Sequence, residues 1–230
     1  MADSGELSQL KELIEVFPDK FSSSDEDAKE ANALARTRYE ALDNEILPYI
    51  IRRIQEGNLV LTDHVCLQLC QFFHEFLFSD IISINGQFRK IEHPNDGAVF
   101  FGGQKRQELR PRFRGSPPSH IKDDLKKAFK YLRKNNEEQA LENALHFYQK
   151  FVFTHPFYDG NGRIGRLFVN MYLYQFGLYI NWKNLQDKGA FLKKLNYYHD
   201  TNKEEHFGWW VQVCEKEVFE ISEEDEESEN

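Results

Sequence analysis

The sequence predicts an all-α fold, a helical bundle that carries a single β-hairpin. Apolar residues recur at helical spacing over several long stretches of the 230 residues. Residues 84–118 break that spacing with five glycines, four prolines and short apolar runs that suit a hairpin. Apolar residues make up 40% of the chain, which is enough to bury the core of one domain.

The first predicted helix covers residues 31–54. Gly57 follows it and can end a helix, because glycine adopts the left-handed conformation easily. A second helix is expected to begin at Thr62 or Asp63, since either side chain can accept a hydrogen bond from the first turn. The apolar stripe of this helix continues to Leu77.

The expected hairpin has strands at Phe88–Ile91 and Ala98–Phe101, which are joined around Pro94–Gly97. The helical pattern returns after it. Further helices are expected over residues 121–133, 137–153 and 162–176, and a last helical stretch between Lys188 and Phe219.

Composition divides the chain into three parts. Residues 1–30 are an acidic arm that is expected to be partly helical, and residues 31–219 form the main domain. Residues 220–230 hold seven acids and no base, so they carry most of the net charge of −9 and are expected to be a disordered tail.

Residues 105–134 have the opposite bias, with eleven bases and three acids. Such an excess can dock an acidic partner or phosphates. A solvated loop and helix face also explains it, and we favour that interpretation.

The expected compartment is the cytoplasm. No signal peptide and no apolar run long enough to span a membrane are present in the sequence. Cys66, Cys70 and Cys214 lack the spacing of a disulfide scaffold and are expected to be reduced thiols. Export as an effector stays an alternative.

The most informative segment is Thr154–Arg166, which lies between two helical apolar stripes. Pro156 cannot continue the first helix without losing a backbone hydrogen bond. The segment is therefore expected to be a tight loop that enters a helix N-terminus, where unpaired N–H groups attract anions. Gly160 and Gly162 let a phosphate approach the backbone, and Arg163 and Arg166 lie on one helix face.

Two further residues of this loop point to group transfer. Asp159 would repel a phosphate unless a cation lay between them, and Mg²⁺ held by one carboxylate and phosphate oxygens fits. His155 can act as a general base near neutral pH. A base, a metal ligand and an anion site together indicate transfer of a phosphate-containing group.

The segment resembles the signature of the Fic family, His-Pro-Phe-x-Asp/Glu-Gly-Asn-Gly/Lys-Arg followed by Gly-Arg. Gly86–Arg89 also resembles the Gly-x-x-Arg that opens the hairpin of Fic domains, and the resemblance covers roughly residues 60–215. It implies a helical fold with a hairpin flap over the active site. The matched signature positions are His155, Pro156, Phe157, Asp159, Gly160, Asn161, Gly162, Arg163 and Arg166.

The resemblance implies a protein adenylyltransferase, which moves AMP from ATP to a Ser, Thr or Tyr hydroxyl and releases pyrophosphate. His155 would deprotonate the hydroxyl, and Asp159 would hold Mg²⁺ between the α- and β-phosphates. Phe157 would anchor the loop, and Arg166 would bind the γ-phosphate. The residues implied to cradle the other phosphates are Gly160, Asn161, Gly162 and Arg163.

The hairpin is expected to act as the flap that docks the backbone of a target protein by strand addition. The target can be the enzyme itself. A membrane or nucleic acid partner is not expected, and a separate inhibitory antitoxin is one possibility. The flap residues are Ala98, Val99, Phe100 and Phe101.

Other functions stay open at this point. Transfer of UMP or phosphocholine by the same fold is one alternative that the loop leaves open, and a non-catalytic binding module is another. Doc-like transfer of phosphate is disfavoured by Gly162 and Arg166. Inhibition is undecided, because no Ser/Thr-x-x-x-Glu is followed by Gly or Asn; degenerate versions occur at Ser22–Glu26 and Ser222–Glu226.

Several other side chains are assigned to packing rather than chemistry. Cys66, Cys70 and His74 share one predicted helix face and are expected in the core, not at a zinc site. His199 and His206 are expected to be exposed. Three tryptophans are likewise assigned to packing: Trp182, Trp209 and Trp210.

Overall fold

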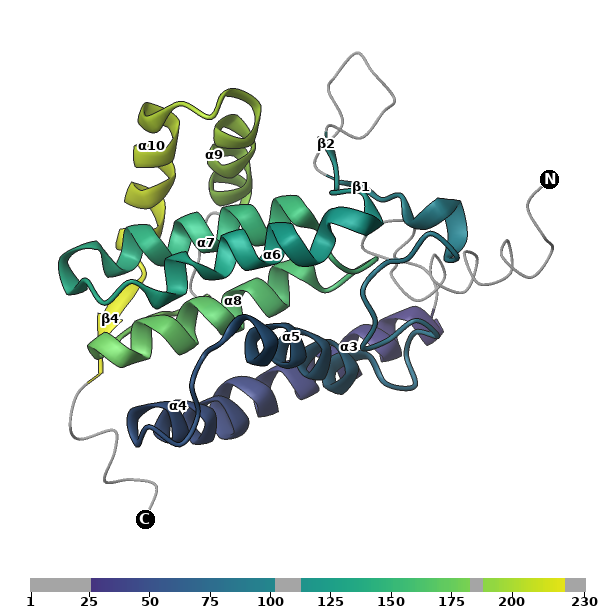
Figure 1. Cartoon of the computed structure of the whole chain (residues 1–230), viewed down its shortest axis with the longest axis horizontal. Helices are drawn as coiled ribbons and strands as arrows, with labels where there is room; N and C mark the ends of the chain where they lie inside the picture. Colours follow the sequence, from purple (N-terminus) through teal and green to yellow (C-terminus); the bar gives the residue numbers. More distant parts are fainter. Residues whose placement is uncertain (1–25, 102–112, 183–187, 222–230) are drawn as a thin grey trace.

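A computed structural model describes residues 26–101, 113–182 and 188–221, and the acidic arm up to residue 25 and the tail from 222 lie outside them (Figure 1). The described chain is mainly helical and carries two small antiparallel sheets. The predicted fold class is confirmed. The helices are α3 (Glu26–Ala41), α4 (Leu47–Gln55), α5 (Asp63–Phe78), α6 (Ile121–Phe129), α7 (Ala140–Thr154), α8 (Asn161–Leu173), α9 (Lys188–Thr201) and α10 (Glu204–Glu215).

The first predicted helix is α3 continued by α4 through a wider π-helical segment, Leu42–Ile46. Pro48 stands at the start of α4 and has no N–H to donate, which explains a local change of helical pitch before it. Gly57 ends this helix with a φ of 71°, as expected. Thr62 caps α5, because its hydroxyl accepts the N–H of Val65 at 3.2 Å.

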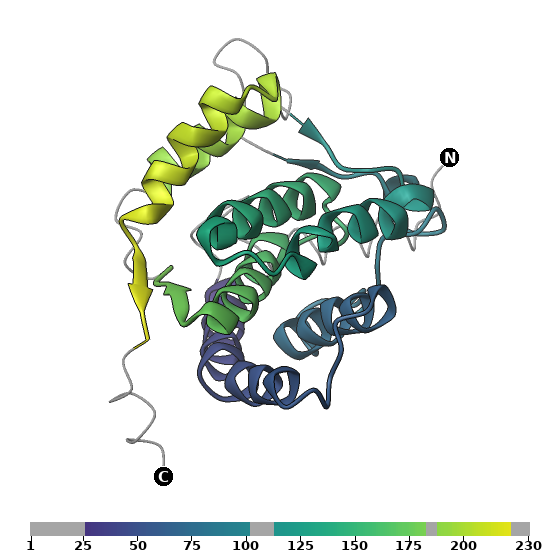
Figure 2. The ribbon, with the colours of Figure 1, turned by 60° about the vertical axis from the view of Figure 1, so that its left-hand side comes forward.

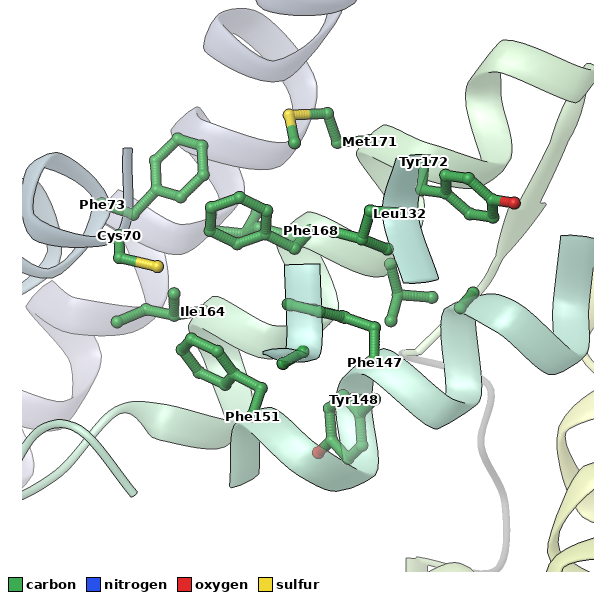
Figure 3. Close-up of a cluster of buried hydrophobic side chains, with 14 of the residues drawn as sticks. Cys70, Phe73, Leu132, Phe147, Tyr148, Phe151, Ile164, Phe168, Met171 and Tyr172 are labelled. Atoms are coloured by element: carbon green, nitrogen blue, oxygen red, sulfur yellow. The ribbon is translucent and has the colours of Figure 1, made fainter. Parts of the chain in front are cut away.

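The core forms where α7 and α8 pack against each other, with α5 and α6 beside them (Figures 1 and 3). It is built mostly from rings: Phe168 of α8 contacts Phe73, Phe129 and Phe147 at centroid distances of 5.5, 5.5 and 5.6 Å. Gly165 lets the two central helices approach, since a Cβ there would lie 3.0 Å from the ring of Tyr148. This packing fixes the end of α7 and the start of α8. The segment His155–Arg166, which leaves α7 and runs into α8, is called the signature loop.

The hairpin has a different register from the predicted one. Its strands are β1 (Phe100–Phe101) and β2 (Phe113–Arg114), which pair antiparallel. The prediction of a strand at Phe88–Ile91 is wrong, because the N–H of Arg89 donates to the carbonyl of Pro156 in the signature loop instead of to a neighbouring strand. Pro94–Gly97, the predicted turn, is a short 3₁₀ segment.

A second sheet was not predicted. β3 (Leu178–Ile180) pairs antiparallel with β4 (Val218–Glu220), which joins the end of α8 to the end of α10. Glu220, assigned to the tail from composition, therefore belongs to a strand. In Figure 2, α9 and α10 lie together on one side of the central helices. Among the described residues, no helix is long and apolar enough to cross a membrane.

The three cysteines are buried free thiols, as expected. Burial raises the pKa of Cys66 to about 12, so this thiol keeps its proton. Within the described ranges, no group of three or more His, Cys, Asp or Glu side chains could hold a metal ion. Cys66, Cys70 and His74 are buried in the core, as predicted.

Part of the basic segment falls outside the described residues, which resume at Phe113. Several of its described cations have acidic neighbours. Lys126 pairs with Asp123 and Lys127 with Asp124, each three residues apart on α6, while Arg133 pairs with Asp63 of α5. These pairs support the solvated helix face over a phosphate dock.

Candidate active site

The signature loop begins at His155, which caps the C-terminus of α7. Its φ and ψ of 50° and 60° are left-handed, which is uncommon for a residue other than glycine. The N–H of His155 donates to the carbonyl of Phe151 at 3.1 Å and closes the last turn of the helix. The loop therefore starts from a sharply defined backbone position.

The His155 imidazole is held on two sides. Its Nδ1 lies 3.1 Å from the carbonyl oxygen of Val152. A carbonyl can only accept, so Nδ1 carries the proton and the basic lone pair of the neutral ring is at Nε2. The ring of Phe101, from β1, stacks on the imidazole at a centroid distance of 4.4 Å and an angle of 12°. His155 is 8% exposed, so the structure brings flap and base together.

Arg89 connects the hairpin to the segment Thr154–Pro156 at the start of the signature loop, which is called the base end. Its side chain is buried, and Nε donates to the carbonyl of His155 at 2.7 Å. One terminal nitrogen donates to Ser116 and Thr154 carbonyls at 2.8 and 3.2 Å, and the other donates to the Gly97 carbonyl. Burial lowers the pKa of Arg89 to about 10, which still leaves it charged at neutral pH. This single guanidinium therefore joins four backbone carbonyls from three segments.

Phe157 is fully buried beneath the loop. Its ring stacks on His74 of α5 at 4.1 Å and contacts Phe88 at 5.2 Å. His74 is itself fixed, because Nδ1 accepts the N–H of Gly86 at 2.9 Å, and burial lowers the pKa of His74 to about 3. The neutral imidazole is thus part of the support below the signature loop.

The side chain of Asn161 closes the loop on itself. Its oxygen accepts the N–H of Phe157 at 3.0 Å, and its amide nitrogen donates to the Phe157 carbonyl at 2.9 Å. The residue is buried, with 3% of its surface exposed. Asn161 therefore shapes the loop, whereas phosphate contact through its backbone stays a prediction.

Gly160 begins α8 in a left-handed conformation, with φ of 73°. A Cβ at this position would lie 2.3 Å from the ring of Phe78, so no side chain fits. The N-cap supplies no side-chain hydrogen bond, which leaves the positive end of the helix available to an anion. Gly162 is less constrained, because its Cβ would meet only the Tyr148 hydroxyl at 3.5 Å.

Asp159 lies immediately before this helix start and is partly exposed, and its carboxylate accepts the N–H of Gly160. One carboxylate cannot make a metal site alone. It fits a hard cation such as Mg²⁺ whose other ligands are phosphate oxygens and water. Asp159 is thus compatible with the predicted metal role.

Arg163 and Arg166 extend from the first two turns of α8. The Arg163 guanidinium carbon lies 4.9 Å from the ring centre of Phe78. The Arg166 guanidinium carbon lies 5.7 and 5.9 Å from the ring centres of Tyr39 and Trp182. Aromatic faces hold both guanidiniums beside the helix N-terminus, which is where a polyphosphate would be bound.

The flap residues divide into two kinds. Phe100 is 57% exposed, whereas Phe101 faces the base. Val99 accepts the N–H of Gly115 at 3.0 Å, and the Ala98 N–H donates to Asn95 at 2.8 Å. The structure thus brings Phe101 to His155, whereas Phe100 faces outward.

Some contributions to the site were missed in the sequence. His199 was expected to be exposed, but its ring contacts Phe113 and Phe153 at 5.2 and 5.1 Å and lies within the aromatic cluster beside the flap. Asn170 of α8 was not identified as a contributor to the site. It is buried, because its side chain bonds the backbone of Ile180 and accepts Trp182 Nε1 at 3.2 Å.

The comparisons with known proteins agree with this geometry. Residues 64–173 match the family model described as Fic/DOC family. A curated relative named probable protein adenylyltransferase aq_aa38, from Aquifex aeolicus (strain VF5), is 26% identical over 115 residues, which are 42% of this chain and 36% of the relative. The match spans only about a third of that relative.

Solved structures share the fold at low identity. The N-terminal Fic domain of a Bartonella effector protein from Bartonella sp. AR 15-3 has a TM-score of 0.60 at 16% identity, over 86% of this chain and 82% of that chain. BepC from Bartonella tribocorum, solved with bound AMPPNP, has a TM-score of 0.58 at 14% identity, over 84% of this chain and 87% of that one.

Proposed function

From the Fic/DOC family domain that this chain contains at residues 64–173, we propose that the protein is a protein adenylyltransferase, which transfers AMP from magnesium ATP to a hydroxyl side chain of a target protein. The match supports a Fic-type transferase. The finer assignment to AMP transfer has two supports: the curated relative carries an adenylyltransferase name, and the neighbour BepC was solved with AMPPNP.

The observation that carries the proposal is the fixed orientation of His155. With Nδ1 donating to Val152, the lone pair at Nε2 can accept the proton of a target hydroxyl. The hydroxyl oxygen then forms a bond to the α-phosphorus, and the bond between that phosphorus and the oxygen bridging to the β-phosphate breaks. Pyrophosphate leaves with the electron pair, and the proton stays on His155.

The anion end of the loop has a complementary task. The N-terminus of α8 and the guanidiniums of Arg163 and Arg166 would bind the triphosphate and stabilise the charge that develops on the leaving pyrophosphate. Asp159 would hold Mg²⁺, which supplies charge neutralisation between the phosphates when bound. Gly160 permits close approach of a phosphate to the backbone.

The flap would present the target. Strand β1 has only β2 as a partner within the described residues, and an extended target segment could add to its other edge. Phe100 is exposed at this edge, while Phe101 covers the base. Backbone pairing would bring a target hydroxyl to His155 with little demand on the target sequence.

The test is transfer of a tagged AMP group from an ATP analogue to protein, with His155→Ala as the matched variant. We expect His155-dependent labelling of a target or of the enzyme itself, and at least 100-fold less with the variant. Equal labelling by the variant would refute the proposal. Competition by ATP, UTP, GTP and CDP-choline separates AMP transfer from transfer of UMP or phosphocholine.

A further inference from the structure

Tyr39 of α3 lies outside the residues that match the family, yet it borders the anion end of the loop. The guanidinium carbon of Arg166 is 5.7 Å from the centre of the Tyr39 ring. The ring of Trp182 faces the same guanidinium at 5.9 Å. Arg166 is therefore held between a ring that precedes the matched domain and one that follows it.

Two polar atoms at this place have no hydrogen-bond partner. The hydroxyl oxygen of Tyr39 and the Nε of Arg166 are both buried, and neither has a partner among the described residues. A buried polar group without a partner is costly, so such a pair calls for an explanation. Because the Arg166 guanidinium lies over the Tyr39 ring, the two atoms belong to one neighbourhood and point to a ligand that both could bind.

Both atoms can donate a hydrogen bond, which suits a ligand with acceptor atoms. The Nε of an arginine can only donate. Burial raises the pKa of Tyr39 well above its usual range, although the Arg166 charge opposes this, so the hydroxyl keeps its proton and can donate as well. A ligand that accepts a hydrogen bond from each atom would satisfy both, and the charge of Arg166 favours an anion over water.

The surroundings keep both rings in place. Trp182 is fixed by Asn170, which accepts its Nε1–H at 3.2 Å. Tyr39 lies on the last turn of α3, directly before the π-helical segment Leu42–Ile46. A π-helical segment shifts the positions of side chains on a helix and often occurs at functional sites.

We propose that Tyr39 donates a hydrogen bond to the terminal phosphate of a nucleoside triphosphate and completes, together with Arg166, the site for that group. The proposal rests on the proposed function for the identity of the nucleotide. It extends the binding site to α3, so that the part of the chain before residue 64 takes a direct part in substrate binding. An acceptor group that reaches both atoms would satisfy the two buried donors.

The first test measures binding by titration calorimetry with magnesium ATP, AMP and inorganic tripolyphosphate. Tyr39→Phe removes only the hydroxyl, and Tyr49→Phe on α4 is the matched control, since Tyr49 is 62% exposed. We expect Tyr39→Phe to weaken ATP and tripolyphosphate binding by about tenfold, the effect of one hydrogen bond to a charged group, without a change for AMP.

A second test measures thermal unfolding with and without ligand. The stability of Tyr39→Phe relative to the natural protein is expected to change sign when ligand is added. Without ligand, Tyr39→Phe is expected to melt at the same temperature as the natural protein or higher, because it removes a buried group without a partner. With saturating tripolyphosphate, the natural protein is expected to gain more stability than the variant. A clear loss of stability in the ligand-free variant would mean that the hydroxyl already has a partner, and would overturn the proposal.

The remaining outcomes also decide. Unchanged ATP and tripolyphosphate affinity in Tyr39→Phe overturns the inference and leaves AMP transfer intact as a hypothesis. Equal weakening for AMP overturns it too, because the effect is then not specific to the terminal phosphate. Conversely, Tyr39-dependent tripolyphosphate binding in a protein that transfers no AMP supports the anion site and refutes only the proposed reaction.

Discussion

The two ends of the signature loop differ in how their polar groups are satisfied. At the base end, the carbonyls of Thr154, His155 and Pro156 all accept hydrogen bonds from Arg89, and the His155 ring has its own acceptor and a stacked ring. At the anion end, Arg166 and Tyr39 each keep a buried donor that has no partner within the part of the chain that the structure describes.

This difference indicates a division of labour. Groups that must hold one orientation throughout the reaction are fixed by the protein before substrate arrives, which lowers the cost of reorganisation in the transition state. Under the proposed function, the groups at the anion end would keep unused donors for a mobile polyphosphate. Substitutions at the base end are therefore expected to lower the stability of the protein. Substitutions at the anion end are expected to weaken ligand binding.

The largest effect is expected when the base end loses its guanidinium. Arg89→Met leaves up to four buried carbonyls without that donor, so the free energy of unfolding should fall by about 3 kcal/mol or more. Urea unfolding measures this. Lys90→Met, at an exposed neighbour, is the control and should change little. A loss below about 1 kcal/mol for Arg89→Met would break the comparison.

A smaller effect is expected at Gly160, the residue at which α8 begins. Gly160→Ala adds a methyl group 2.3 Å from Phe78 and strains a φ of 73°, and should cost about 2–4 kcal/mol. Gly177→Ala is matched in backbone, with φ of 68° and nothing within 4 Å, and should cost only about 1 kcal/mol. Equal losses in thermal unfolding would show that backbone strain, and not the approach of Phe78, requires Gly160.

Two adjacent residues of the flap are expected to affect different kinetic constants. Phe101→Leu removes the ring stacked on His155, and should lower kcat for AMP transfer by about three- to tenfold with an unchanged KM for ATP. Phe100→Leu shortens an exposed ring and should raise KM for the target protein instead. Interchangeable effects of the two variants on kcat would contradict a specific role for the stack.

The sequence predicted best what depends on local pattern. The helices follow from apolar spacing, and the cap at Thr62 and the stop at Gly57 follow from the chemistry of single residues. The loop from His155 to Arg166 could be placed between two helices because proline and glycine interrupt strong helical patterns there. These are short-range effects that the chain determines locally.

Contacts between residues far apart in the chain could not be predicted from the sequence. Phe88 and Ile91 suggested a short strand, but Arg89 between them bonds the loop some 65 positions away, and no local pattern reports this. Pairing of β3 with β4 and the approach of Tyr39 to Arg166 likewise depend on how helices pack.

The smallest expected effect is a dependence of stability on pH. Measuring it distinguishes protonation that unfolds the protein from protonation of the proposed base. His146 on α7 stacks on Phe207 at 3.9 Å, and burial, with Lys150 and Lys134 nearby, lowers its pKa to about 4. Above pH 6.5 the residue is neutral in folded and unfolded chains. As pH falls from 6.5 towards 4, the unfolded chain binds a proton that the folded one does not, so the free energy of unfolding decreases.

This loss would be mistaken for protonation of His155 in an activity profile. His146→Gln removes the titration, and the free energy of unfolding should then decline less between pH 6.5 and 4 than in the natural protein, as measured by urea unfolding at several pH values. His74, whose pKa is also lowered, contributes with the same sign in both proteins and cancels in the difference. Parallel stability profiles would show that His146 is not the source. An acid limb of activity that persists in His146→Gln would then report the base itself.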